Sequence, residues 1–297
     1  MSAHAEAHTG AIPPASRADR LRGGAFRVAL LSTLVVSCGL LAILVWDVAR
    51  DGVPRLSVDF LTSPPSALPR LAGIEPAIMG TIWLMGLCAL FIIPVGVASA
   101  IYLEEYADTA RWWNRLIEIN IQNLAAVPSI VYGILGLAFI VRPPLELGRV
   151  VLAGALTLGL LVLPVVIIAA REAIRAVPPS IREGSLALGA TQWQTIRRQV
   201  LPAAVPGIAT GVILALSRAI GETAPLIVVG AATFVAFNPD GPSSPFTALP
   251  IQIFNWISQP QTEFKLKAAA AILVLLAILL AMNSAAIYLR NRFEKTW

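Results

Sequence analysis

The sequence predicts an all-α membrane protein with six transmembrane helices. Of its 297 residues, 57% are hydrophobic and only 13% are charged, whereas about a quarter of the residues in a soluble domain are charged. The mean hydropathy is +0.76. The apolar residues gather in runs that reach the length of about 20 residues needed to cross a bilayer. Together these observations exclude an ordinary soluble fold.

Six apolar runs are candidate membrane spans, and polar connections separate them. Pro94, Pro128 and Pro164 lie inside the second, third and fourth runs, where neighbouring helices can satisfy the freed backbone groups. The fifth run is long enough to tilt, or to break near Pro225. The six runs cover residues 26–48, 77–102, 121–141, 150–170, 207–236 and 267–289.

The distribution of basic residues predicts that both termini lie in the cytoplasm. With that orientation, the inner segments hold roughly twice as many Arg and Lys residues as the outer loops. We therefore expect a disordered cytoplasmic tail over residues 1–24 and a first helix with its outer loop over 25–70. A transmembrane core over 71–290 and a cytoplasmic tail over 291–297 follow. The net charge of +5 belongs to these connections and does not indicate nucleic-acid binding.

Arg218 and Glu222 are two charged residues inside the fifth apolar run. Their spacing of four residues would place them on one face of a helix. A charge at the bilayer centre costs about 2.5–3.5 kcal/mol on insertion scales, so such residues generally have a function. Arg218 is suited to binding an oxyanion in a substrate path, and Glu222 could neutralise it or compete with the anion. The alternative is a salt bridge that only locks the helix.

The fifth run also carries small residues at a spacing of four. Such a stripe lets two membrane helices approach closely, so we expect it to pack against a neighbouring helix. The stripe consists of Gly207, Gly211, Ala215 and Ala219.

The other candidate reactive residues do not suggest an enzyme. Glu104, Glu105 and Asp108 lie in an inner connection and are expected to form a solvated turn. Cys38 and Cys88 lie in apolar runs, where a lone thiol is usually a packing residue. The sequence also has no Gly-Lys step, so it lacks the phosphate loop of an ATPase. We predict no catalytic residue, no metal site and no cofactor on this chain.

The inner connection over residues 171–206 is long, polar and rich in helix formers. From Ser180 to Val200 its apolar residues are spaced for short amphipathic helices. Pro178 and Pro179 favour a helix start, and Pro202 is expected to end the segment. The pattern predicts either a docking surface for a partner or a helix that lies on the membrane surface.

Three anchors in this connection resemble the EAA loop of ABC-importer permeases. They are Glu183, Gly189 and the pair Leu201-Pro202, and Gly189 precedes Pro202 by thirteen residues. In that family the loop is a short helix that turns at the glycine and docks on a separate ATPase subunit. The resemblance implies the type I, MetI-like fold of ABC importers, with residues 171–206 as the coupling loop.

The chain after about residue 70 resembles the phosphate-import permease family, and its PstA-type subunit more than the PstC-type subunit. The resemblance implies import of inorganic phosphate with three kinds of partner. These are a homologous PstC-type permease, two copies of an ATPase subunit that binds ATP and Mg²⁺, and an extracytoplasmic phosphate-binding protein. The segments that carry the resemblance are GIEPAIMGTIW from residue 73, AIYLEEYAD at 100–108, NLAAVPSIVYGILGLAF at 123–139, GATQWQTIRRQVLPAAVPGI at 189–208, LSRAIGETAPLI at 216–227 and TALPIQIFNWIS at 247–258.

Three other interpretations remain open from the residues themselves. The first is a permease for another oxyanion, such as sulfate, molybdate or phosphonate, because an arginine binds each of them. The second is a transporter driven by an ion gradient, against which the connection over 171–206 argues. A membrane enzyme is the third. The proline-rich outer loop over 238–266 is either a contact for a binding protein or a plain lid over the helix ends.

Overall fold

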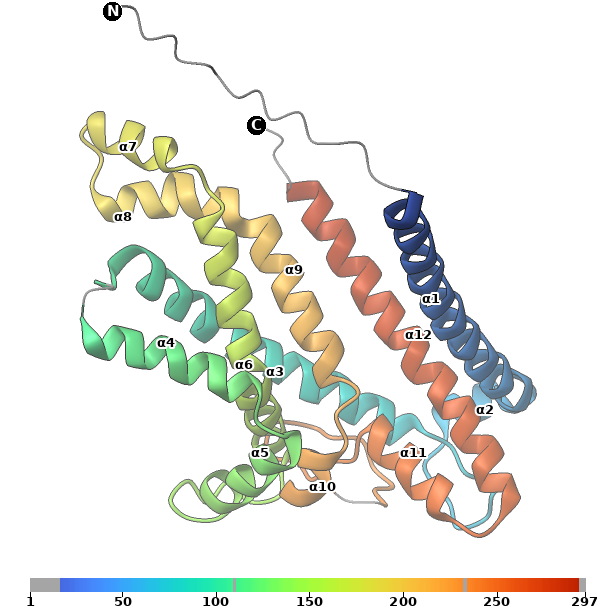
Figure 1. Ribbon diagram of the computed structural model, residues 1–297. Helices are drawn as coiled ribbons and strands as arrows, with labels where there is room; N and C mark the ends of the chain where they lie inside the picture. The colour runs from blue at the N-terminus through green and yellow to red at the C-terminus, as the bar shows by residue number, and fades with distance from the viewer. Residues whose placement is uncertain (1–16, 109–110, 232–233, 294–297) are drawn as a thin grey trace, which may run out of the picture. The chain divides into compact units, whose positions relative to one another are not determined.

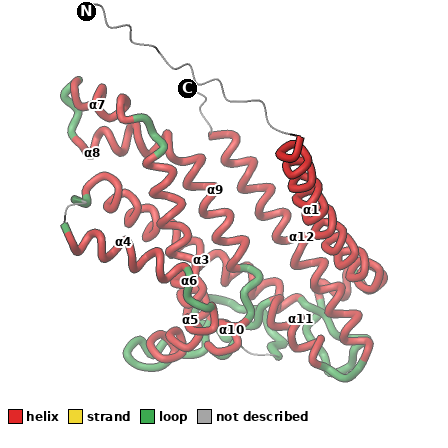
Figure 2. The backbone as a smooth tube through the Cα atoms, in the orientation of Figure 1, coloured by secondary structure: helices red, strands yellow, loops and turns green. Residues whose placement is uncertain are grey.

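The computed structural model describes residues 17–108, 111–231 and 234–293, and all regular structure in these ranges is helical (Figure 1, Figure 2). This confirms the all-α fold class. The helices are α1 (Arg17–Gly52), α2 (Val58–Thr62), α3 (Glu75–Ile101), α4 (Trp112–Ala125), α5 (Ser129–Gly136), α6 (Val151–Arg175), α7 (Pro179–Ala187), α8 (Gln192–Thr195), α9 (Leu201–Ala219), α10 (Ala224–Val229), α11 (Leu249–Ser258) and α12 (Thr262–Phe293).

Five helices are long and apolar enough to cross a membrane, and a bent pair of helices makes a sixth span if it is counted as one. The predicted number of spans therefore agrees with the structure. The five helices cover Arg20–Arg55, Glu75–Tyr106, Val151–Arg175, Gln192–Ala219 and Thr262–Tyr288, and the bent pair covers Trp112–Ala125 with Ser129–Val141.

The third predicted span, residues 121–141, is not a straight helix. Its two parts, α4 and α5, meet at 106° across a short break. Pro128 lies at this break, where it is the N-cap residue of α5. A proline disfavours helical geometry in the residue before it, which explains why the chain turns here. Pro94 and Pro164, in contrast, lie inside α3 and α6 as expected.

The fifth predicted span, residues 207–236, is displaced towards the N-terminus. The helix already begins at Gln192 and ends at Ala219. The expectation that Pro202 ends the preceding segment is therefore wrong. A π-helical turn at Ile196–Val200 ends two residues before Pro202, which lies in the first turn of α9. The helix can continue past the proline because such a local π adjustment satisfies the backbone groups that the proline frees.

The N-terminal tail is shorter than we expected. Residues 17–24, predicted to be disordered, form the first turns of α1. Residues 1–16 lie outside the described part of the chain, as do 294–297 of the predicted C-terminal tail. Residues 291–293 belong to α12.

The chain divides into two units at Val48 and Ala49. The described residues of the first unit, 17–48, all lie in the single helix α1 and form no core by themselves. In the second unit, the long helices α3, α6 and α9 build the main core, and buried residues from each of them meet there. The largest fully buried side chains of this core include Ile92, Leu158 and Ile174.

The small residues of α9 pack against α6, as the sequence predicts. A Cβ atom on Gly207 would lie 2.6 Å from the Cβ of Ala173, and one on Gly211 would clash with Ala169. The two helix backbones therefore approach each other as closely as glycine allows.

Helices α7 and α8 lie at one end of the second unit, whereas α10 and α11 lie at the other (Figure 1). We call these the hairpin end and the lid end. At the lid end, the segment before α11 crosses α3, and the backbone N–H of Leu249 donates to Thr81 Oγ1 at 2.9 Å. About half of the predicted outer loop over 238–266 is helical, and one face of α11 is buried, including Leu249, Ile251 and Trp256. The segment is therefore more than a plain connection.

Candidate functional site

Helices α7 and α8 form a helical hairpin that turns at Gly189. The backbone φ of Gly189 is +83°, a left-handed conformation that side chains rarely adopt. The N–H of Gly189 bonds to the Leu186 carbonyl at 2.9 Å, and that of Ala190 bonds to the Ser185 carbonyl at 3.2 Å. This pair of bonds is a Schellman motif, the usual way in which a glycine ends a helix. The predicted helix break at Gly189 is confirmed.

A capping box starts the second arm of the hairpin. The Thr191 side chain accepts from the backbone N–H of Gln194, whose side chain accepts in return from the backbone N–H of Thr191. Between the arms, the hydroxyls of Ser185 and Thr195 are hydrogen-bonded at 2.9 Å. Local sequence signals therefore define both the turn and the second arm.

The other anchors of the predicted coupling loop lie along this hairpin and its continuation. Glu183 is on α7 and is exposed, and within the described residues its side chain makes no ion pair or hydrogen bond. Leu201 and Pro202 are the first two residues of α9; Leu201 is half-buried and Pro202 is exposed. Leu188, at the tip, is 91% exposed. The hairpin thus presents free polar and apolar groups, but its contact with a partner stays a prediction.

Arg218 and Glu222 lie at the far end of the same long helix from the hairpin. Arg218 is in the last turn of α9, whereas Glu222 lies beyond the helix end, in the turn before α10. The prediction that both share one helical face is therefore wrong. They are nevertheless paired, with Arg218 Nε 3.4 Å from Glu222 Oε1.

The Arg218 side chain is 45% exposed, whereas that of Glu222 is 18% exposed. Within the described part of the chain, the two terminal nitrogens of the Arg218 guanidinium have no hydrogen-bond partner. These two nitrogens are therefore available to a ligand or to a partner. The structure is compatible with both interpretations of the pair, the substrate path and the salt bridge that only locks the helix, so the role of Arg218 stays a prediction.

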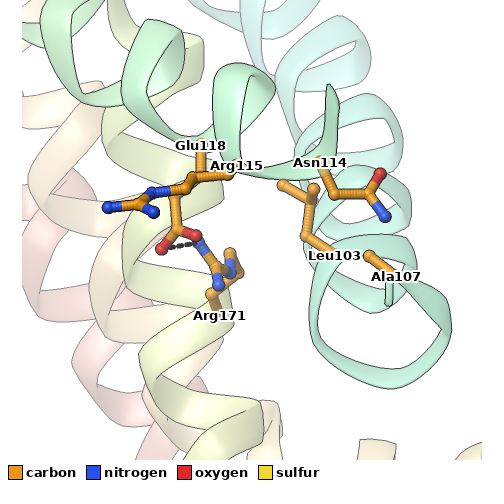
Figure 3. A pocket seen from close by; sticks show the side chains of 6 residues that line it. All are labelled: Leu103, Ala107, Asn114, Arg115, Glu118 and Arg171. Atoms are coloured by element: carbon orange, nitrogen blue, oxygen red, sulfur yellow. Dashed lines mark hydrogen bonds and ion pairs between the residues drawn. The ribbon is translucent and has the colours of Figure 1, made fainter. Parts of the chain in front are cut away.

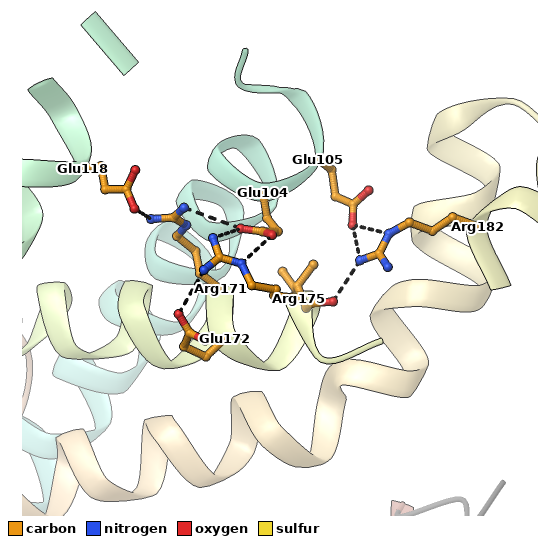
Figure 4. Close-up of polar contacts among 8 residues, drawn as sticks. Glu104, Glu105, Glu118, Arg171, Glu172, Arg175 and Arg182 are labelled. Carbon is orange, nitrogen blue, oxygen red and sulfur yellow. Dashed lines mark hydrogen bonds and ion pairs between the residues drawn. The ribbon is translucent and has the colours of Figure 1, made fainter. Parts of the chain in front are cut away.

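Sequence reasoning missed a cluster of ion pairs at the hairpin end. Glu104 and Glu105, which we expected in a solvated turn, have side chains that are only 16% and 9% exposed. Both lie in a π-helical turn at Tyr102–Tyr106 that continues α3. Their partners are arginines of α6 and α7, as Figure 4 shows. The solvated-turn interpretation is therefore wrong for these two carboxylates.

Glu104 connects two arginines of α6. Its carboxylate accepts from Arg175 Nε and Nη2 at 2.9 Å each, and it lies 3.5 Å from Arg171 Nη2. Arg171 Nη1 donates in turn to Glu118 of α4 at 3.0 Å. One network of charges therefore joins the end of α3 to α4 and α6.

A cavity of about 270 Å³ adjoins this network (Figure 3). Two buried polar atoms at its wall, Asn114 Oδ1 and Arg171 Nε, have no hydrogen-bond partner among the described protein groups. Buried polar groups of this kind are normally satisfied by water. The residues that line the cavity are Leu103, Ala107, Asn114, Arg115, Glu118 and Arg171.

These features describe a membrane protein in which one long helix, Gln192–Ala219, joins the exposed α7–α8 hairpin to the Arg218–Glu222 pair. The class of protein is that of transport-system membrane components, as the following match shows. The family model described as "Binding-protein-dependent transport system inner membrane component" matches residues 92–295, and the chain belongs to this family.

Curated relatives of this chain are permease proteins. A probable ABC transporter permease, YqgI of Bacillus subtilis, is 32% identical and the match covers 93% of this chain and 96% of the relative. The phosphate transport system permease protein PstA of Haemophilus influenzae is 31% identical over 85% of this chain and 89% of its own. PstA 1 of Mycobacterium tuberculosis is 36% identical, and the match covers 73% of this chain and 70% of the relative.

Solved structures of ABC importers share the fold. A chain of the bacterial alginate ABC transporter, in complex with an alginate-bound periplasmic protein, has a TM-score of 0.67 at 18% identity and covers 94% of this chain and 98% of its own. A chain of the MetNI methionine transporter has a TM-score of 0.60 at 16% identity, and the match covers 74% of this chain and 95% of that chain. These likenesses confirm the MetI-like permease fold.

Proposed function

We propose that this chain is the transmembrane permease subunit of an ATP-driven importer of inorganic phosphate. The observation that carries the proposal is its likeness to PstA-type phosphate permeases, at 31–36% identity over most of the chain. Membership in the binding-protein-dependent family and the MetI-like fold support import rather than export. The family is a family of transporters, so we assign no catalytic residue to this chain.

Arg218 and Glu222 contribute to the substrate path in this proposal. A guanidinium that is 45% exposed on a membrane helix needs a polar environment, which lipid tails do not supply. The face of Arg218 is therefore covered by a partner subunit or by a water-filled path. Phosphate is an oxyanion that matches the donor geometry of arginine. Glu222, 3.4 Å away, holds the guanidinium between passages and competes with the anion, which permits release.

Energy enters through the α7–α8 hairpin. The side chains of Glu183 and Leu188 are exposed there, as expected of residues that meet another protein. We assign the partner on this hairpin to an ATPase subunit that binds ATP and Mg²⁺, so this chain needs no cofactor of its own. A PstC-type permease, two ATPase copies and an extracytoplasmic phosphate-binding protein complete the complex.

The same proposal fixes the orientation in the cell membrane. The hairpin end faces the cytoplasm together with both termini, in accord with the excess of basic residues in the inner segments. An impermeant maleimide should then label Glu146→Cys, but not Leu188→Cys, in intact cells that carry a chain without Cys38 and Cys88. The reverse pattern would contradict the orientation.

Uptake of labelled phosphate at micromolar concentration tests the function. The chain and its partner genes are expressed in cells whose own high-affinity phosphate uptake has been deleted. We expect phosphate uptake to be restored, and excess sulfate or molybdate not to reduce it. If the complex assembles and restores no phosphate uptake, phosphate is the wrong substrate and another oxyanion takes its place. Uptake without any bound ATPase would contradict the ATP-driven mechanism.

A further inference from the structure

We propose that Glu105 is the anchor of the coupling hairpin, and that its ion pair with Arg182 transmits hairpin movement to α3. The inference rests on the proposed function of the hairpin as the ATPase contact. It assigns Glu105 and Arg182 as positioning residues, because they touch neither substrate nor nucleotide.

Both arms of the hairpin converge on Glu105. From α7, Arg182 donates to the Glu105 carboxylate through Nε at 3.0 Å and through Nη2 at 2.8 Å. From α8, Gln192 Nε2 donates to the backbone carbonyl of Glu105 at 2.6 Å. Arg182 and Glu105 are 77 residues apart in the sequence, and Gln192 is 87 residues from Glu105. A segment at the end of α3 therefore holds the hairpin at two points.

Arg182 also holds the end of α6. Its Nη1 donates to the Val177 carbonyl at 2.6 Å and its Nη2 to the Ile174 carbonyl at 2.9 Å. These carbonyls belong to the C-terminal end of α6, where a helix leaves acceptors free and favours positive charge. One guanidinium thus joins three elements, namely α7, the end of α6 and the end of α3 (Figure 4).

The first arm of the hairpin has few other contacts with the bundle: Ile181 packs against the main core, and the second arm continues into α9. All nine residues of α7 remain partly or fully exposed, so α7 adds no fully buried side chain to the core. The Arg182 and Glu105 side chains are 22% and 9% exposed. An ion pair that is this well shielded is directional and is weakened little by salt. The pair therefore adds a shielded polar connection where the apolar contact of α7 is limited to partly buried residues.

The neighbouring network extends the connection. Glu104, next to Glu105 on the same turn, binds Arg175 and Arg171 of α6, and Arg171 binds Glu118 of α4. A displacement of the hairpin would consequently move α3, α4 and α6 together. The second arm of the hairpin, α8, continues without a break into α9. The hairpin is thus connected to α3, α4, α6 and α9.

The test uses the complete complex in proteoliposomes with the binding protein. Phosphate transported per ATP hydrolysed is measured for wild type, Arg182→Gln, Glu105→Gln and the double variant. We expect each single change to lower this ratio about tenfold while ATPase subunits stay bound, and the double change to be no worse than either single one. Arg55→Gln, which breaks an exposed pair with Glu263, is the matched control and should leave the ratio unchanged.

A structural readout separates this inference from the choice of substrate. Spin labels on Tyr102→Cys and Ala187→Cys, in a chain without Cys38 and Cys88, report the distance between the end of α3 and the hairpin. In wild type we expect one narrow distance with and without ATP, and a broad distribution in Arg182→Gln. If the wild-type complex transports no phosphate, the proposed function fails. The distances between the spin labels still show whether Glu105 and Arg182 hold the hairpin against α3.

Either of two results would overturn the anchor. The first is a ratio of phosphate transported to ATP hydrolysed that is the same in Arg182→Gln as in wild type. The second is a change in the distance between the hairpin and α3 when ATP binds to the wild-type complex. If Arg182→Gln does not accumulate in the membrane, Arg182→Lys replaces it. Lysine keeps the charge but has three donors on a single nitrogen, so it cannot reproduce the four hydrogen bonds of Arg182. An intermediate ratio is therefore expected, and a wild-type ratio contradicts the inference.

Discussion

At the scale of single residues, the arginines of this chain differ sharply in how they are satisfied. Arg182 uses all three guanidinium nitrogens inside the fold, whereas Arg218 uses only Nε. The Arg171 side chain is 12% exposed and that of Arg218 is 45% exposed. The shielded arginines hold elements together, and the half-exposed one is available to a ligand or a partner.

Loss of the Glu104 carboxylate should destabilise the hairpin end. Glu104→Gln leaves Arg171 and Arg175 without their shared counter-charge. Removal of one partner from a shielded pair costs about 3 kcal/mol. We expect a clear fall in the melting temperature of the purified chain in detergent.

Glu263→Gln is the control for this change, because the Glu263 side chain is 54% exposed in its pair with Arg55. Exposed pairs contribute about 0–1 kcal/mol, so its melting temperature should stay close to that of wild type. Equal melting temperatures for Glu104→Gln and wild type would show that the network is not structural.

These carboxylates also show where sequence reasoning ends. Glu104 and Arg171 are 67 residues apart, and nothing in either local segment indicates that they meet. A polar pattern such as YLEEYAD is typical of a solvated turn when it is considered alone. The turn at Gly189, in contrast, is predictable from the sequence because its signal is local, and the structure confirms it. Glu183 and Arg218 also carry local signals, a spacing and a charge within an apolar run, and their roles stay predictions.

At the scale of elements, close packing of α6 against α9 controls how these helices can move. Gly211→Ala would place a Cβ against Ala169, so the two helices would have to separate. Overpacking of this kind costs about 1–3 kcal/mol. We expect a lower melting temperature and reduced phosphate uptake per molecule in the membrane.

The matched control is Gly86→Ala in α3, where a Cβ would have no neighbour within 4 Å. Alanine favours helix by about 1 kcal/mol over glycine, so this change should be neutral or stabilising. If Gly211→Ala behaves like Gly86→Ala, the small-residue stripe is not a packing seam.

Prolines explain why helix boundaries were harder to predict than helix number. Pro128 stands at the 106° bend of α4 and α5, whereas Pro202 opens α9 without a break. The difference lies in the preceding turn, because a π-helical turn at Ile196–Val200 leads into Pro202. A hydropathy pattern does not distinguish these two outcomes, since it carries no information on backbone geometry.

At the scale of the whole molecule, Gln192–Ala219 connects the two predicted sites. One end of this helix belongs to the hairpin, and the other end carries Arg218. One continuous helix, packed closely against α6, therefore links the hairpin to the region of Arg218, and we expect movement of the hairpin to be passed along it. This continuity was not predicted, because Pro202 was expected to end the segment.

In the proposed importer, Arg218 binds phosphate in the substrate path. Uptake of labelled phosphate by Arg218→Gln, at matched membrane abundance, is the decisive experiment. Loss of the charged donor should reduce uptake at least about tenfold, whereas the exposed Arg55→Gln should transport like wild type. ATPase binding should be unchanged, because the hairpin lies at the other end of the helix. Wild-type uptake by Arg218→Gln would contradict the account and leave the pair with Glu222 as a structural contact.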